Sequence, residues 1–413
     1  METAGCLQVA LRSVSRMIMA TADSNPGVPT PCAPPGNGLL VLLAAMTPIQ
    51  LESVFANLTA SFPNEELLIA APDAIPADSY PSLRIVPAPV NNSAWALTAT
   101  DFVSAYQLAE KHQARAILML GSESGSISPS ALRELANAVL DPTDLALPYY
   151  ELTPHAGLIN SAILYPLTRA LFASRVRFPL AVDLGLSLRM AKRMADAAQR
   201  FTAINQGETP LWPVNEATVA GFAIGQFDVG PSVQPTAPEL NTVLPLLIGP
   251  LFSDIKAKAA YWQRFRPLPP AHNTMPLPPS PATDTTADIA PMLSAFRLAY
   301  TNLHEVWSLV LPPNSLLRLK QLAASDAAAF CLSDGLWARI VYDFLLAYRL
   351  RTINRGHLLG ALIPLYLAWV ASHFNIIASG GDPEGHIETA AAAFESEKTY
   401  LLSRWRWPDR FNP

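Results

Sequence analysis

The chain has 413 residues, 50% of them hydrophobic and 15% charged, and its formal net charge is -5 at pH 7. This length suffices for two domains with a large buried core, and the weakly acidic balance lacks the basic footprint of a nucleic-acid-binding protein. The three cysteines, Cys6, Cys32 and Cys331, are scattered, so they predict neither a disulfide framework nor a metal cluster, and we expect a cytoplasmic protein.

The N-terminal region carries no clear structural pattern. The first twenty residues are mildly apolar, but Glu2, Arg12 and Arg16 interrupt them, which is not typical of a secretory signal. The residues that follow, up to position 37, are rich in proline and lack periodicity. We expect residues 1–37 to form a flexible N-terminal segment.

From Gly38 onward, short apolar runs alternate with helical patterns. Such alternation is typical of a parallel sheet with helices on both faces. Because ligands of these sheets lie at the carboxyl ends of the strands, we expect Asp73 and residues 121–124 at the floor of a nucleotide pocket. The expected strands cover residues 39–45, 66–73, 83–89 and 115–120, with helices expected over 47–62 and 98–113.

A proline-rich segment divides the chain. Residues 265–288 contain seven prolines and predict a linker or loop. It separates a sheet-containing domain, residues 38–264, from a helical domain, residues 289–413, in which apolar residues recur at helical spacing. Residues 358–378 of the helical domain are long and apolar enough to span a bilayer. A proline and His373 interrupt them, and a buried helix gives the same pattern, so we expect no membrane span.

Three segments carry motifs: "AILMLGSESGSIS" at 116–128, "YPLTRAL" at 165–171 and "FPLAVDLGLS" at 178–187. Together with the layout around them, they resemble the retaining GT-A glycosyltransferases typified by glucosylglycerate and mannosylglycerate synthases. In that group the fourth strand ends in Asp-x-Asp, a Pro-Leu-x-Arg-x-Leu segment precedes a loop ending in Gly and an acid, and a late His completes a metal site. The resemblance covers residues 38–375. It implies an α/β, GT-A-like fold with a mostly parallel sheet flanked by helices, followed by a C-terminal helical domain.

The resemblance implies a metal site, from which this sequence departs. Gly121-Ser122-Glu123 stands in place of Asp-x-Asp, Val182 in place of the loop glycine, and Gln234 in place of the late His. Such enzymes hold a divalent cation on hard oxygen ligands, where it neutralises the leaving diphosphate. Glu123 and Gln234 are therefore the candidate ligands, and we expect binding of Mg²⁺ or Mn²⁺ to be weakened or absent. An alternative is that Glu123 is an ordinary acid in a turn and Gly121 supplies an unusual backbone angle.

The resemblance also implies roles for side chains of the site. Asp183 is the candidate catalytic residue, orienting the acceptor or stabilising the charge that develops at the anomeric carbon, and its alternative role is a helix cap. Tyr366 and His373 are candidate acceptor contacts, or packing residues of an aromatic stripe. Three arginines are expected to offset the donor diphosphate, or to pair with acids or face solvent. The candidate donor-binding residues are Asp73, Ser122, Glu123, Arg169, Arg175 and Arg177.

These observations lead to two functional expectations. The first is a glycosyltransferase that moves a sugar from a nucleotide-sugar donor to a small or glycan acceptor without a conventional metal site. The alternative is a catalytically inactive relative that acts as a binding, regulatory or structural partner. The sequence lacks the motifs of hydrolases, kinases, metalloproteases and dinucleotide-dependent oxidoreductases, so we expect no redox cofactor. The segment "SRWRWPDRF" at 403–411 is expected to pack on a neighbouring subunit or on its own domain, which leaves a homo-oligomer open.

Overall fold

The computed structural model describes residues 38–63, 65, 67–71, 83–88, 95–232, 239–264 and 287–408. Asp73, Gln234, the segment 1–37 and residues 265–286 of the predicted linker lie outside the described residues. What the sequence predicts for them therefore stays a prediction.

Seven strands form a single sheet: β1 (Leu39–Leu43), β2 (Leu67–Ala71), β3 (Leu83–Pro87), β4 (Ala116–Leu120), β5 (Leu145–Glu151), β6 (Leu184–Ser187) and β7 (Ile224–Pro231). Their order is β3-β2-β1-β4-β6-β5-β7. All neighbours run parallel except β6, which is antiparallel to both β4 and β5. This arrangement confirms the predicted mostly parallel sheet.

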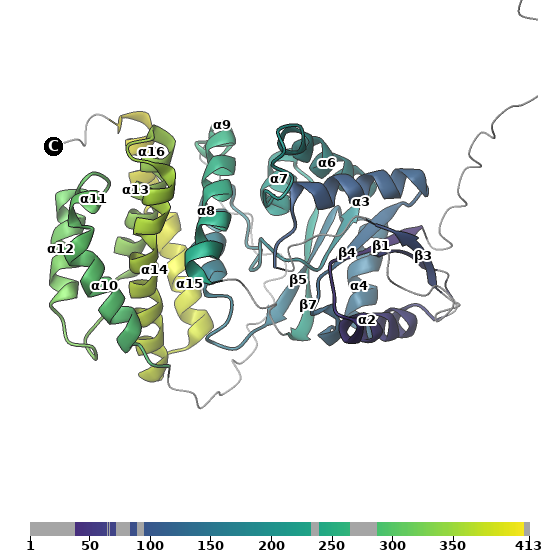
Figure 1. The fold of residues 1–413 in the computed structure, drawn as a ribbon, viewed down its shortest axis with the longest axis horizontal. Coiled ribbons are helices and arrows are strands. Elements are labelled where there is room, and N and C mark those ends of the chain that lie inside the picture. The colour runs from purple at the N-terminus through teal and green to yellow at the C-terminus, as the bar shows by residue number, and fades with distance from the viewer. Residues whose placement is uncertain are drawn as a thin grey trace, which may run out of the picture. The chain divides into compact units, whose positions relative to one another are not determined.

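Continuous apolar runs produce the central strands. Strand β1, LLVLL, and strand β4, AILML, are buried at every position, and Val41 pairs with Leu118 in the register between them. Strands covered on both faces have no solvent side, so their sequences do not alternate. Figure 1 shows the covering helices: α2 (Pro48–Ser61) and α4 (Pro129–Leu140) on one face, α3 (Ala99–Lys111) and α6 (Leu188–Thr202) on the other.

Helix caps fix where the covering helices begin. Thr47 and Gln50 form a capping box at the start of α2, in which the Gln50 side chain accepts the Thr47 N–H at 2.9 Å. Ser187 caps α6 by accepting the Met190 N–H. Since Ser187 ends β6 and α6 follows at once, the chain turns from the sheet into the helix without a loop.

The rest of the described chain is helical, as the sequence predicts for the C-terminal region. The shorter elements are a 3₁₀ turn η3 (Ser124–Ser126), a π-helical turn η4 (Asn160–Leu164), α5 (Tyr165–Phe172), α7 (Pro213–Ala220), α9 (Ala259–Trp262) and α11 (His304–Ser308). The longer helices are α8 (Leu240–Ala257), α10 (Ala290–Asn302), α12 (Pro313–Ala323), α13 (Asp334–Leu350), α14 (Arg355–Ala378), α15 (Pro383–Ser396) and α16 (Lys398–Arg406).

Buried apolar side chains form two large clusters. One surrounds the sheet, and the other joins the C-terminal helices to η4, α5 and α8, which precede the predicted linker in sequence. Trp337 on α13 reinforces this second cluster, because its indole Nε1 donates a hydrogen bond to the Ala162 carbonyl of η4 at 2.8 Å. Helix α14 is long and apolar enough to cross a membrane, but 67% of its most apolar window is buried within the fold. Its composition is that of a core helix.

Candidate functional site

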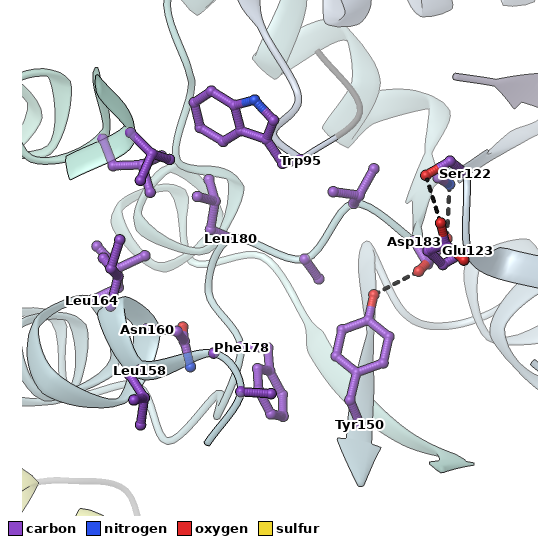
Figure 2. A pocket seen from close by; sticks show the side chains of 18 of the residues that line it. Trp95, Ser122, Glu123, Tyr150, Leu158, Asn160, Leu164, Phe178, Leu180 and Asp183 are labelled. Carbon is purple, nitrogen blue, oxygen red and sulfur yellow. Dashed lines mark hydrogen bonds between the residues drawn. The ribbon is translucent and has the colours of Figure 1, made fainter. Parts of the chain in front are cut away.

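A cavity of about 370 Å³ opens at the carboxyl ends of β4 and β5 (Figure 2). The turn after β4, residues 121–123, and the loop before β6, residues 178–183, form one side of it. Val243 and Leu247 of α8 and Tyr366 of α14 also line it. The cavity therefore lies where ligands of parallel sheets bind, with one wall supplied by helices of the second cluster.

Asp183 lies at the polar end of this cavity. Its Oδ1 accepts the Gly121 N–H at 2.8 Å, and its Oδ2 accepts the Tyr150 hydroxyl at 2.7 Å. The residue is only 7% exposed. Burial raises the pKa of Asp183 above its ordinary value of 3.8, while the hydrogen bonds from Tyr150 and Gly121 oppose that rise and the charge of Glu123 adds to it. Asp183 is thus a buried carboxyl group fixed by two donors.

The alternative role of Asp183 as a helix cap is wrong. Asp183 directly precedes β6, and the next helix, α6, begins four residues after the strand starts. Ser187 provides the cap of α6. The side chain of Asp183 instead accepts hydrogen bonds from the turn after β4 and from the end of β5.

Gly121 and Val182 are in direct contact. A Cβ atom built on Gly121 would lie 2.9 Å from Val182 Cγ1, closer than real Cβ atoms approach. The φ of Gly121 is not in the left-handed region, so the predicted unusual backbone angle is wrong. The close approach of Val182 leaves no room for a side chain at position 121 without a shift of the valine.

Glu123 is partly buried and faces the start of α2. Its Oε1 accepts a hydrogen bond from Gln50 Nε2 at 2.9 Å, and Ser122 Oγ lies 3.5 Å from the same oxygen. Figure 2 shows Ser122, Glu123 and Asp183 side by side at one end of the cavity. Gln50 connects the turn after β4 to the capping box of α2, so Glu123 is held at this position from outside the cavity.

The described residues do not fit a divalent cation. They contain no group of three or more His, Cys, Asp or Glu side chains arranged to hold a metal ion. The two acids of the cavity, Asp183 and Glu123, both accept hydrogen bonds from protein donors. Gln234, the other predicted ligand, lies outside the described ranges.

Two of the three predicted phosphate-binding arginines are paired with acids of α15. Arg169 Nη1 lies 2.5 Å from Glu388 Oε2, and its Nη2 lies 3.0 Å from Glu395 Oε2. Arg177 is bonded to both carboxylate oxygens of Glu384, each at 3.0 Å. Neither arginine lines the cavity, and the described lining contains no Arg or Lys at all.

Arg175, the third predicted phosphate-binding arginine, is exposed and does not line the cavity. Its predicted contact with the donor stays a prediction. It is the member of the trio whose guanidinium no described carboxylate engages.

Of the two predicted acceptor contacts, Tyr366 lines the cavity and His373 does not. Tyr366 lines the cavity and is only 5% exposed, and burial raises the pKa of its phenol. His373 lies behind the lining, where it stacks on Trp369 and its Nδ1 is 2.7 Å from Nδ1 of His386. Burial, followed by the neighbouring His386, lowers the pKa of His373 to about 3. His373 is therefore a neutral packing residue at ordinary pH.

Several lining residues were not predicted from the sequence. Tyr150 is the second-last residue of β5 and could have been found by applying the carboxyl-end rule to that strand. Trp95, Asn160 and Phe178 carry no such signal, since they come from loops and from η4. His155, which the sequence suggests to be a loop residue, also lines the cavity and contacts Phe374 edge to face.

No known family model and no curated protein matches the chain. Among solved structures, it is similar to glucosyl-3-phosphoglycerate synthase from Mycobacterium tuberculosis in complex with Mn²⁺, UDP-glucose and phosphoglyceric acid, with 16% identity over 53% of this chain and 79% of that one, and a TM-score of 0.36. The same enzyme with Mg²⁺ and UDP has 15% identity, covering 52% of this chain and 78% of that one, at a TM-score of 0.35. A further mycobacterial protein has 14% identity over 52% of this chain and 74% of that one, with a TM-score of 0.34.

The synthase belongs to the class of glycosyltransferases that the sequence resembles. Ligand, metal and activity depend on the residues of this chain.

Proposed function

We propose that the chain is a glycosyltransferase-like protein that binds the sugar portion of a nucleotide-sugar without a divalent metal ion. The observation that carries this proposal is the contact between Gly121 and Val182. The valine side chain occupies the space next to the position where the related enzymes have the first acid of their metal motif. Gly121 has no carboxylate to offer a metal ion, and Val182 leaves no room for a carboxylate side chain at this position.

The chemistry of the cavity suits a neutral, hydroxyl-rich ligand. Asp183, Glu123 and Asn160 provide oxygen acceptors for sugar hydroxyl groups. Trp95 and Tyr150 provide apolar ring surface for the carbon faces of a sugar. The absence of Arg and Lys from the described lining argues against a diphosphate lying in this part of the site.

The donor roles of Asp73 for the nucleoside, and of Ser122 and Glu123 for the donor sugar, remain part of this proposal. So does acceptor binding by Tyr366, which faces the cavity from α14.

Calorimetric titration of UDP- and GDP-sugars tests the proposal, with Mn²⁺, with Mg²⁺ and with a chelator. We expect the same dissociation constant under all three conditions, and weaker binding of the nucleotide without its sugar. Binding that requires Mn²⁺ would contradict the proposal, as would no binding of any nucleotide-sugar.

A double variant provides the matched control. Gly121→Asp together with Val182→Gly restores an acid and the space for it, giving two carboxylates two residues apart. We expect this variant to bind Mn²⁺ more tightly than the natural chain does. Equal Mn²⁺ affinities would show that the packing of Val182 is not what excludes the metal.

Sugar transfer is a second candidate function, favoured by the placement of Asp183. A buried carboxyl group held by two donors in a sugar-binding cavity is suited to orient an acceptor hydroxyl or to stabilise positive charge at the anomeric carbon. The pairing of Arg169 and Arg177 with acids of α15 removes two cations that a metal-free transfer would need.

Detection of glycosylated product by mass spectrometry, or of released nucleotide, separates transfer from binding alone. If transfer occurs, Asp183→Asn should abolish turnover while leaving the affinity for the donor within a few-fold. Turnover that survives this change would exclude the role given to Asp183.

A further inference from the structure

A second cavity of about 420 Å³ shares no lining residue with the first. The segment that follows α6 forms one wall, with Trp212 at the start of α7. Helix α8 forms another wall through Pro245, Pro250 and Ser253. Tyr348 of α13 and Arg355 of α14 complete the enclosure.

The unsatisfied polar atoms of this cavity are donors. Trp212 is only 3% exposed, and its indole Nε1 has no hydrogen-bond partner among the described residues. Arg355 Nε is likewise buried and without a partner in the described ranges. An indole and a guanidinium can donate hydrogen bonds but cannot accept them, so these two groups call for a ligand that accepts.

The arginines of the cavity have no acid opposite them. The guanidinium of Arg355 lies 4.2 Å above the ring of Tyr348, and no described carboxylate forms an ion pair with it. Arg200, at the exposed edge, rests on Phe201 and also forms no ion pair with the described residues. Two positive charges therefore border the cavity.

Asp254, the one acid among the described lining residues, is neutralised by its own neighbours. It forms an ion pair with Lys258 and accepts a hydrogen bond from Asn215 Nδ2 at 2.9 Å. Lys258 also lies 2.7 Å from Glu216, which in turn lies 3.0 Å from Arg193. Two acids and two cations cancel within this group, so it leaves the charges of Arg200 and Arg355 uncompensated.

Apart from Gln206, Thr209 and Ser253, the rest of the described lining is mainly apolar. Pro245 and Pro250 interrupt α8, and Leu211 and Leu359 face them from the neighbouring elements. Gly249 lies between the two prolines, and a Cβ there would approach Leu359 Cδ1 at 3.3 Å. This packing makes a compact apolar wall beside the two arginines.

We infer that the second cavity binds a small organic anion. Its phosphate or carboxylate group accepts hydrogen bonds from Trp212 and Arg355, and its apolar body packs on the prolines of α8. Arg355 is the first residue of α14, whose positive dipole end favours an anion there, although the Asn354 side chain already accepts the N–H groups of Gly356 and His357. The site is independent of the sugar-binding cavity.

Phenyl phosphate is the test ligand, with phenol as the neutral match, benzoate as the carboxylate and inorganic phosphate as the anion alone. The full chain, labelled with ¹⁵N in its eight tryptophans, reports binding through the indole resonances, and Trp212→Phe identifies the one that matters. We expect phenyl phosphate to shift the Trp212 resonance in a saturable way and phenol to leave it unchanged. No shift at millimolar phenyl phosphate, or an equal response to phenol, would overturn the inference. A larger response to benzoate than to phenyl phosphate would assign the site to carboxylates.

Variants locate the anion. Arg355→Gln should weaken phenyl phosphate binding about tenfold, the usual loss for one charge-assisted hydrogen bond. Arg318→Gln, an exposed arginine on α12 outside both cavities, should leave the affinity unchanged. Asp183→Asn should also leave it unchanged, which separates this site from the proposed sugar site. Unaltered affinity in Arg355→Gln would refute the assignment, and the comparison of phenyl phosphate with phenol holds whatever that variant does to folding.

Discussion

At the scale of single residues, Gly121 and Val182 pack directly against each other at the end of β4. Under the proposed function, this contact fills the position of a metal ligand with apolar atoms. The carboxylate of the neighbouring Asp183 accepts the Gly121 N–H with one oxygen and the Tyr150 hydroxyl with the other. The turn after β4 is therefore closed by packing on one side and by hydrogen bonds on the other.

The volume match between these residues predicts a specific loss of stability. Gly121→Ala should lower the free energy of unfolding by about 1–3 kcal/mol, the usual effect of overpacking a core. Val182→Ala in the same chain should recover part of that loss, and urea unfolding of all four combinations measures the coupling. Gly360→Ala, where a Cβ meets nothing within 4 Å, is the control and should cause no loss. Additive effects at positions 121 and 182 would contradict the contact.

Asp183 should give the stability a distinctive dependence on pH. Because burial raises its native pKa above 3.8, the native state holds a proton that the unfolded chain has released between 3.8 and that native pKa. Relative to Asp183→Asn, the natural chain should therefore gain stability as the pH falls through the native pKa, and the gain should level off below 3.8. Urea unfolding of both proteins across this range is the measurement. A difference independent of pH would show that Asp183 titrates normally.

At the scale of elements, α15 holds α5 through ion pairs that connect distant parts of the sequence. Arg169 is buried on α5 and reaches both Glu388 and Glu395, while Tyr165 donates to Glu388 at 2.6 Å. Arg177 adds a third contact to α15 just before the loop that carries Asp183. The C-terminal helices thus fix the approach of that loop to the cavity.

Breaking these pairs should be costly because Arg169 would remain buried without a carboxylate. Replacing both Glu388 and Glu395 by Gln should lower the free energy of unfolding by about 2 kcal/mol. This loss is smaller than that for a wholly buried ion pair because the Glu388 side chain is 37% exposed. The control is Lys192→Ala, which removes an ion pair exposed on both sides and should change stability by less than about 0.5 kcal/mol. Equal losses of unfolding free energy in the two variants would show that the burial of Arg169 does not strengthen its ion pairs.

His373 of α14 lies 2.7 Å from His386 of α15, whose other ring nitrogen lies 3.2 Å from Asp334 of α13. The pKa of His373 is about 3 in the native state, against an ordinary value of 6.5. Between these two pH values the unfolded chain therefore binds a proton at His373 and the native state does not. Stability should therefore decline as the pH drops from 6.5 toward 3, opposite in direction to the effect of Asp183. His373→Phe should flatten this part of the curve. A variant that retains the full slope would place the responsible titration elsewhere.

Sequence reasoning succeeds where the signal is local. The alternation of apolar runs and helical periods predicts the parallel strands, and the helix expected over 47–62 is α2, Pro48–Ser61, with Thr47 as its cap. The antiparallel β6 was not predicted because it is only four residues long. Asp183, Glu123 and Tyr366 were chosen through a family resemblance, and the structure brings all three to one cavity.

What sequence reasoning misses depends on contacts between distant positions. Tyr150 and Asp183 are 33 positions apart, and Arg169 and Glu388 are 219 apart, so no local spacing reveals either pair. The packing of Val182 on Gly121 is invisible for the same reason. Motif positions show which residue types differ from the family that the sequence resembles, but only the fold shows which side chains pack against those positions.

At the scale of the whole molecule, the two apolar clusters do not follow the order of the chain. Helices α5 and α8 belong in sequence to the sheet-containing part, yet their apolar side chains pack among the C-terminal helices. The predicted domain boundary at 264 stays a prediction, but a cut there would expose the faces of both helices. The wall that Tyr366 forms in the cavity at the ends of β4 and β5 would be lost as well.

This arrangement predicts the behaviour of a truncated chain. Residues 38–264 expressed alone should aggregate or bind a hydrophobic dye, because the faces of α5 and α8 would meet solvent. Size-exclusion chromatography and dye fluorescence are the measurements, with residues 38–413 as the control. A monodisperse, cooperatively unfolding fragment would show that the sheet-containing part folds without the helices.

The contact between Gly121 and Val182 also limits how this sequence can change over generations. An acid introduced at position 121 alone meets the valine, and a glycine introduced at position 182 alone leaves an empty volume beside a backbone that has adapted to it. Both first steps toward a metal motif are therefore less stable than the present sequence, and only the second step brings a ligand. A lineage that has acquired this pair is therefore held to it by selection for folding, whatever its ligand.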